Sequence, residues 1–271
     1  MKNLLLLTAF ALIFFVQSCG QTSQQATETS KQLQTTESNV KLVSENESEN
    51  LFSFSNFAKI EDKDGYVNIR EEANTNSKIV GKIKSGEIVY IFNYGDELGN
   101  WLIIDYLEND ENLLTGYIHK SRLKPINSYE HIPSVWHDEN GAEFILRNIQ
   151  IKIKTEKFDY EANKKYFSTF QYATYAVDKY KHQEIWGTDG TLPQTHYTSI
   201  TANIDNQTIE IPEKEIENLF NTNNEYSECY FDKNTETLYI ILMNSDGAGA
   251  YRVIFIIEKG KYKSRKIYNA N

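Results

Sequence analysis

Apolar and polar residues alternate along most of the chain beyond about residue 58, and this alternation predicts β-strands. In residues 149–154, three isoleucines alternate with Gln150, Lys152 and Lys154, which is the period of a half-buried strand. Three pairs of apolar runs are each joined by a short turn-forming segment, and such pairs predict hairpins. The predicted hairpins cover residues 200–211, 226–243 and 251–268. The pattern therefore predicts a mainly β fold.

The same pattern is compressed between residues 58 and 126, where five short strands are predicted. They cover residues 67–69, 79–83, 88–91, 101–104 and 115–118. Turn-forming segments such as residues 84–87 separate them. So many short strands in so short a segment favour a small closed barrel, because closure removes exposed strand edges.

The remaining segment, residues 128–271, is long enough for one independent domain. It is mostly β, but two short helices are predicted within it. Pro212 with acidic residues at 213 and 215 predicts a helix over residues 213–220, since proline is favoured at the first helical position and acids in the first turn. The second helix is predicted over residues 160–167. We therefore expect a β-rich α+β domain after the barrel.

The first 18 residues have the pattern of an export signal. Lys2 gives a short basic start, and residues 4–16 form an uncharged apolar run. A helix that spans a bilayer needs about 20 apolar residues, so this run is too short to cross a membrane. Its length fits the apolar core of a signal peptide, for which about 7–15 residues suffice.

The segment Val16-Gln17-Ser18-Cys19 resembles the lipobox of bacterial lipoproteins. The resemblance implies that residues 1–18 are removed as a signal peptide and that lipid, such as palmitate, is attached at Cys19. Several acyl chains on one residue hold a protein stably on a membrane. No acidic cluster follows Cys19, and the resemblance then implies an envelope protein on the outer membrane that faces the periplasm.

Residues 20–50 are rich in Gln, Thr, Ser, Glu and Asn and contain no aromatic residue. Such a segment cannot bury enough apolar surface to offset the entropy lost on ordering. Residues 19–51 are therefore predicted to be a disordered tether, with a reach of roughly 30 Å for a flexible chain of this length. Aromatic residues begin again at Phe52, where the barrel segment, residues 52–127, is expected to start.

Within that segment, five short stretches occur in the order and at the spacing of the bacterial SH3 domain, and this part of the chain resembles that family. The stretches are Gly65-Tyr66-Val67-Asn68-Ile69-Arg70, Asn76-Ser77-Lys78-Ile79-Val80-Gly81, Lys84-Ser85-Gly86-Glu87, Trp101, and Gly116-Tyr117-Ile118-His119. The loop over residues 108–112 is longer and more acidic than is usual in the family. The resemblance implies an SH3-like barrel.

Bacterial SH3 domains act as adhesive modules, so the resemblance implies non-covalent binding of cell-wall peptide (peptidoglycan) or of an envelope protein. Exposed aromatic side chains are expected to line a shallow groove, because they supply contact area at low entropic cost. The candidate groove residues are Tyr66, Tyr94, Trp101 and Tyr117. For Trp101 and Tyr117, the alternative is that the ring is buried in the barrel core. Asn68 and Arg70 are interpreted as structural residues.

Charge and residue spacing give no support for nucleic-acid binding, a metal, a cofactor or catalysis. The formal net charge is −10, whereas proteins that bind nucleic acid have clusters of Lys and Arg that contact its phosphates. The five histidines are not spaced as metal ligands, and no Cys-x-x-Cys, Gly-x-Ser-x-Gly or phosphate loop occurs. Cys229 lies in an aromatic strand beside Glu228, which favours a buried structural thiol over a nucleophile. We therefore expect a protein that is not an enzyme.

Two local motifs stand out in the C-terminal segment, residues 186–190 and residues 244–251. The second resembles a segment of uncharacterised envelope proteins from the Bacteroidetes. Its glycine spacing does not fit a calcium-binding helix-loop-helix, because the first and last ligand positions would fall on Leu242 and Val253. A tight turn is predicted instead, with Gly247 and Gly249 at positive φ.

Several functional alternatives stay open at this stage. The C-terminal domain can be a periplasmic inhibitor or immunity-type protein, in which acidic residues mimic a charged substrate. The chain can also be a cell-wall hydrolase delivered by the barrel, or the barrel can be a spacer. The oligomeric state is not predicted.

Overall fold

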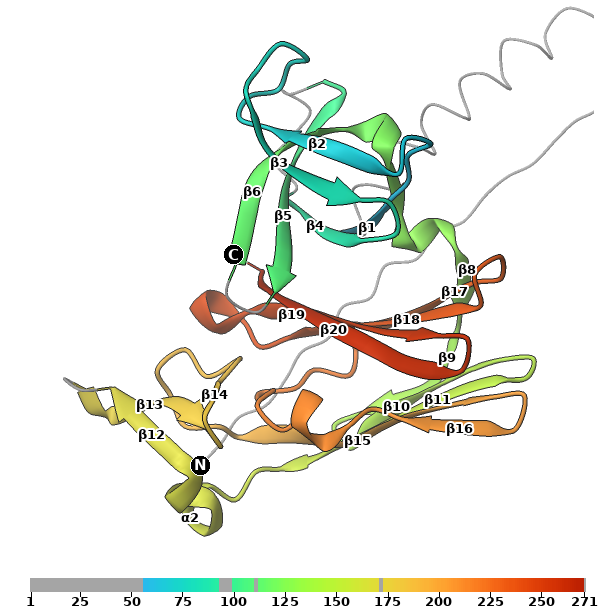
Figure 1. The fold of residues 1–271 in the computed structure, drawn as a ribbon. Coiled ribbons are helices and arrows are strands. Elements are labelled where there is room, and N and C mark those ends of the chain that lie inside the picture. The colour runs from blue at the N-terminus through green and yellow to red at the C-terminus, as the bar shows by residue number, and fades with distance from the viewer. Residues whose placement is uncertain (1–55, 93–98, 110–111, 171–172, 271) are drawn as a thin grey trace, which may run out of the picture. The chain divides into compact units, whose positions relative to one another are not determined.

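The computed structural model describes residues 56–92, 99–109, 112–170 and 173–270, and these form a mainly β structure of four antiparallel sheets (Figure 1). The predicted signal peptide, the lipid site at Cys19, the tether over residues 19–51 and the candidate groove residue Tyr94 lie outside these residues. Among the described residues, no helix has both the length and the apolar character needed to cross a membrane.

The first sheet contains seven strands in the order β3-β2-β6-β5-β4-β1-β7. The strands are β1 (Phe57–Ile60), β2 (Tyr66–Arg70), β3 (Ile79–Lys84), β4 (Ile88–Phe92), β5 (Trp101–Asn109), β6 (Asn112–His119) and β7 (Leu123–Pro125). Each strand gives at least one side chain to a single apolar core, which includes Ile60, Ile69 and Ile104. The sheet therefore wraps around its own core, as expected for an SH3-like barrel.

Two strands of this sheet were not among the five predicted, β1 and β7. Both are short: β1 does not alternate simply between apolar and polar residues, and β7 has only three residues. In β1, Phe57 and Ala58 are both buried because they contribute to different cores on the two sides of the strand. In β7, Pro125 follows Leu123 and Lys124 in a three-residue strand that pairs only with β1, at the end of the sheet.

The C-terminal segment contains two five-stranded sheets that share one apolar core. One sheet has the order β16-β15-β11-β10-β9 and the other has the order β20-β19-β18-β17-β8. The strands of the first are β9 (Ser134–Asp138), β10 (Gly141–Leu146), β11 (Ile149–Lys157), β15 (Thr195–Ile204) and β16 (Gln207–Glu210). Those of the second are β8 (Glu130–Ile132), β17 (Ser227–Asp232), β18 (Thr237–Asn244), β19 (Tyr251–Glu258) and β20 (Lys261–Asn269). Alternate residues of β11 and β18 meet in the shared core, including Ile151 and Ile240.

Strands β18 and β19 are buried on both faces. Leu238, Ile240 and Leu242 face the core between the two sheets. The intervening Tyr239 and Ile241 belong to a second core, which also contains Phe57 and Tyr90 of the barrel. Because successive side chains of a strand point to opposite faces, only a strand covered on both sides can bury such a continuous apolar run. The barrel and the C-terminal sheets therefore share a buried interface.

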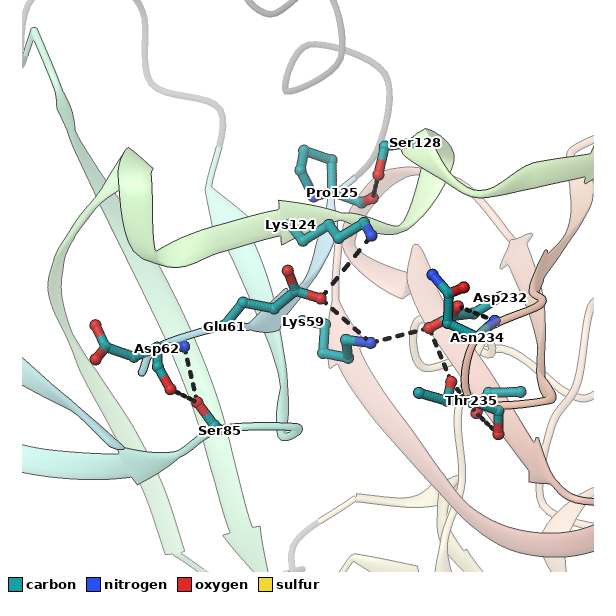
Figure 2. Close-up of polar contacts among 11 residues, drawn as sticks. Lys59, Glu61, Asp62, Ser85, Lys124, Pro125, Ser128, Asp232, Asn234 and Thr235 are labelled. Carbon is teal, nitrogen blue, oxygen red and sulfur yellow. Dashed lines mark hydrogen bonds and ion pairs between the residues drawn. The ribbon is translucent and has the colours of Figure 1, made fainter. Parts of the chain in front are cut away.

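Aromatic rings and one ion pair join the two parts at this interface. Tyr90 of β4 stacks on Tyr268 of β20 with ring centroids 5.1 Å apart. Beside this apolar centre, the Lys59 ammonium of β1 donates a hydrogen bond of 3.0 Å to Asp232 of β17 (Figure 2). Glu61 lies 3.4 Å from the same ammonium and 4.0 Å from that of Lys124. The contact thus combines apolar packing with a partly buried charge network.

A three-stranded sheet and short helical turns complete the C-terminal part. The strands are β12 (Phe167–Phe170), β13 (Ala173–Tyr180) and β14 (Gln183–Glu184). The helix predicted over residues 160–167 is present as α2 (Tyr160–Asn163) followed by a 3₁₀ turn, and the Asp159 side chain caps it by accepting from the Ala162 N–H. Further 3₁₀ turns lie at Lys120–Arg122, Ile126–Ser128, Glu213–Glu215 and Gly247–Gly249.

The helix predicted over residues 213–220 is wrong beyond its first turn. After Glu213–Glu215, the helix does not continue, and Leu219 and Phe220 form isolated β-bridges with Trp186 and His196. The Trp186 N–H donates to Asn218 O, and the Phe220 N–H donates to Trp186 O. These bridges bury Leu219 and Phe220 completely, so tertiary pairing outweighs the local helical signal.

The three predicted hairpins are confirmed as β15–β16, β17–β18 and β19–β20. The turn prediction at residues 244–251 is half right. Gly247 has a φ of 49°, whereas Gly249 does not have positive φ. A Cβ on Gly249 would lie 3.1 Å from the Asp189 Cβ and from the Ser245 Oγ, so close approach explains this glycine.

Candidate ligand groove of the barrel

An open groove of about 360 Å³ lies on the barrel, on strand β2 and the loops beside it. It is lined by Asp62, Asp64, Tyr66, Val67, Asn68, Arg70, Thr75, Trp101, His119, Ser121 and Arg122. The lining residues come from β2 and the loops before and after it, from the start of β5, and from the end of β6 with the 3₁₀ turn that follows it. Concave surfaces that combine aromatic rings with a few polar groups are typical of binding sites.

Two of the predicted aromatic residues lie in this groove. Tyr66 begins β2 and is 43% exposed, and the Lys82 ammonium lies 4.4 Å from the centre of its ring. Trp101 begins β5 and pairs across the sheet with His119 of β6. Its ring meets the His119 ring edge-on with centroids 5.4 Å apart. Both rings are held by the barrel and remain partly accessible from the groove.

The other two predicted aromatic residues are not part of the described groove. Tyr117 lies on β6 between the buried Gly116 and Ile118, and pairs with Ile103 and Arg70. Because side chains alternate along a strand, its ring points away from the barrel core, on the same face as Arg70 and His119, but it is not among the residues that line the groove. Tyr94 lies outside the described residues.

The polar residues of the groove are the ones that the sequence interpretation missed. Asn68 and Arg70, interpreted as structural, both line the groove. The Arg70 guanidinium donates a 2.7 Å hydrogen bond to Ser77 O, so it also holds the loop after β2. Asn68, Arg70 and His119 all occur inside the stretches that resemble the SH3 family, and that was the signal available in the sequence.

The loop before β2 is fixed by Asp62. Its carboxylate accepts a 2.8 Å hydrogen bond from the Asp64 N–H and pairs with the Arg122 guanidinium. The Asp62 N–H and carbonyl both bond to the Ser85 hydroxyl (Figure 2). These bonds hold Asp64 and Tyr66 at the edge of the groove although the loop itself is exposed.

The two motifs of the C-terminal segment meet at one junction. Asn221 Nδ2 and the Ser245 hydroxyl both donate to Gly187 O, at 2.6 and 2.8 Å. The Tyr251 hydroxyl donates to Phe220 O at 3.0 Å. These bonds tie the loop over residues 186–190 to the turn over residues 244–251. They explain both motifs as structural elements of the fold.

Burial shifts the pKa values of one thiol and one imidazole in the C-terminal part. Cys229 is fully buried in the core between the two sheets, and burial raises the pKa of its thiol. A raised pKa keeps the thiol protonated and therefore a poor nucleophile. Burial also lowers the pKa of His196, against the opposing effect of Glu156 at 3.3 Å. In the described part of the chain, no three His, Cys, Asp or Glu side chains are grouped to hold a metal ion.

Comparison with known families gives one finding. Residues 65–124 match the family model of the bacterial SH3 domain. This segment contains strands β2 to β6 and most of the groove lining. No curated protein and no solved structure matches the chain. The match suggests a role in binding cell wall or peptidoglycan for this part of the chain.

Proposed function

We propose that the chain is a lipid-anchored binding protein of the bacterial cell envelope, and that the barrel groove binds cell-wall peptide without catalysis. The observation that supports the proposal is that most residues lining the groove lie within residues 65–124, the segment that matches the bacterial SH3 domain. Two aromatic rings and several polar side chains line the groove, which suits a short peptide with polar groups.

The N-terminal sequence supports the envelope location. The lipobox-like segment ending at Cys19 would anchor the mature chain to the outer membrane, on its periplasmic side. A tether of residues 19–51 would give the barrel a reach of roughly 30 Å from the lipid. A binding domain on such a tether can contact the peptidoglycan layer next to the membrane.

Co-sedimentation with purified peptidoglycan sacculi tests the proposal. The protein is residues 20–271, which keeps every described residue and omits the lipid. We expect Tyr66→Ala to weaken binding about tenfold, since loss of an aromatic contact residue typically costs about 1–2 kcal/mol. Tyr66 is exposed, so the substitution leaves the barrel core intact.

Tyr226→Ala is the matched control, because Tyr226 is a tyrosine of the C-terminal part that is about as exposed as Tyr66 and lies outside the groove. It should bind sacculi like the unaltered protein. Failure of the unaltered protein to pellet with sacculi would overturn the proposal. Equal weakening by both substitutions would mean that the groove is not the binding site.

A further inference from the structure

Most of the charged side chains in the barrel groove already have a partner within the protein. Asp62 and Arg122 form an ion pair with each other. Arg70 donates to Ser77 O, and the His119 Nδ1 lies 2.8 Å from the Ser121 hydroxyl. These groups therefore hold the walls of the groove.

Asp64 differs from them. Its N–H is fixed by Asp62, but among the described residues its carboxylate has neither an ion-pair partner nor a hydrogen-bond donor. The side chain is exposed at the edge of the groove, two residues before the Tyr66 ring. The groove thus presents one unpaired negative charge beside an aromatic face.

Two further features favour a cation at this place. Aromatic faces attract ammonium groups, and although the Lys82 ammonium already lies 4.4 Å from the centre of the Tyr66 ring, the Trp101 ring of the groove has no cation over it among the described residues. In addition, Asn68 Oδ1 in the groove wall is a buried acceptor without a donor among the described residues. An ammonium group has three donors and can satisfy several acceptors at once.

We propose that the groove recognises a free ammonium group of a cell-wall peptide, and that the Asp64 carboxylate is its ion-pair partner. This inference rests on the proposed function and names the chemical group that the groove selects. The aromatic rings of Tyr66 and Trp101 contact the apolar part of the same peptide residue. A peptide whose amine is blocked lacks the charge that Asp64 pairs with.

The experiment compares native sacculi, with their free amines verified by an amine assay, and the same sacculi after acetylation with acetic anhydride. The unaltered protein, residues 20–271, and its Asp64→Asn variant are tested on both. We expect acetylation to weaken binding of the unaltered protein about tenfold, which corresponds to about 1.4 kcal/mol, because it removes a hydrogen bond between charged groups. Asp64→Asn should bind native sacculi equally weakly and should not respond to acetylation.

Glu71→Gln is the control for net charge, because Glu71 is an exposed acid of the same barrel outside the groove, 3.9 Å from Lys78. It should behave like the unaltered protein, and Asp64→Glu should retain the response to acetylation. If the unaltered protein binds both kinds of sacculi equally, the ammonium proposal is overturned while the cell-wall function stands. If it binds neither kind, both proposals are overturned.

Discussion

Lys59 and Asp232 lie 173 positions apart in the chain, yet the Lys59 ammonium donates a 3.0 Å hydrogen bond to the Asp232 carboxylate (Figure 2). Lys59 is on the first strand of the barrel, and Asp232 ends strand β17 of the C-terminal part. Their side chains are only 12% and 3% exposed. The pair therefore connects the two parts of the chain in a place that water reaches poorly, next to the apolar interface around Tyr90 and Tyr268.

Lys59→Met should destabilise the protein by about 3 kcal/mol, because it leaves the buried Asp232 carboxylate without its ion-pair partner. Urea unfolding measures this change. Lys78→Met is the control, since the Lys78 side chain is 72% exposed and its pair with Glu71 is 3.9 Å long. That substitution should cost less than about 1 kcal/mol. Equal effects of the two substitutions would mean that the Lys59–Asp232 contact adds no stability.

The same pair predicts a specific dependence of stability on pH. Burial acts to raise the pKa of Asp232, but the Thr235 hydroxyl, the Lys59 ammonium and the Asn234 N–H outweigh burial and hold it below its ordinary value of 3.8. A carboxyl group whose pKa is lower in the folded than in the unfolded chain adds stability above the unfolded pKa. That stability is lost as the pH falls through the folded pKa.

We therefore expect the unaltered protein to be more stable than Asp232→Asn by a constant amount between about pH 5 and 7. The difference should shrink below about pH 4, as Asp232 becomes protonated in both states. Urea unfolding of both proteins at stepped pH values gives the difference directly. A difference that stays constant down to about pH 2 would contradict the assignment of the lowered pKa to Asp232.

The shared core around Tyr90 and Tyr268 predicts that the barrel and the C-terminal sheets unfold together. Replacing Trp136 and Trp186 by phenylalanine leaves Trp101 as the only tryptophan, and Trp101 lies in the barrel. In this variant, Trp101 fluorescence reports on the barrel, whereas far-ultraviolet circular dichroism reports on the whole chain. The two urea transitions should coincide. A barrel transition at a separate urea concentration would show that the interface does not couple the two parts.

The sequence predicted the strands whose signals are local. The β15–β16, β17–β18 and β19–β20 hairpins were predictable because alternating runs flank turn residues such as Asp205-Asn206 and Lys259-Gly260, and all four of these turn residues adopt positive φ. Strands β1 and β7 were missed because their stability comes from neighbours distant in the chain. The helix predicted over residues 213–220 failed for the same reason, since Trp186 provides β-type partners there.

The candidate site was predictable only in part. Tyr66 and Trp101, two of the four predicted groove residues, line the described groove, and their place inside a family motif was the signal for them; that they bind a ligand stays a prediction. Asp64 carries no such signal, because it is one of many acidic residues in the sequence. Only the structure shows that Asp62 takes the Arg122 guanidinium and that the Asp64 carboxylate has no ion-pair partner among the described residues. The buried interface beneath the barrel was equally hidden, although the unbroken apolar run in β19 is typical of a strand covered on both faces.

The last prediction concerns Cys19, whose lipid attachment is predicted from the sequence alone. Several acyl chains would move the mature protein into a detergent phase, because each buried CH₂ group adds about 0.8 kcal/mol to partitioning. The full-length protein produced in a bacterial host should therefore enter the detergent phase of Triton X-114 and incorporate labelled palmitate. Cys19→Ala should remain in the aqueous phase without label, whereas Cys229→Ala should retain the label because Cys229 is buried in the core. Detergent partitioning of Cys19→Ala equal to that of the unaltered protein would overturn the lipid anchor, and with it the outer-membrane part of the proposed function.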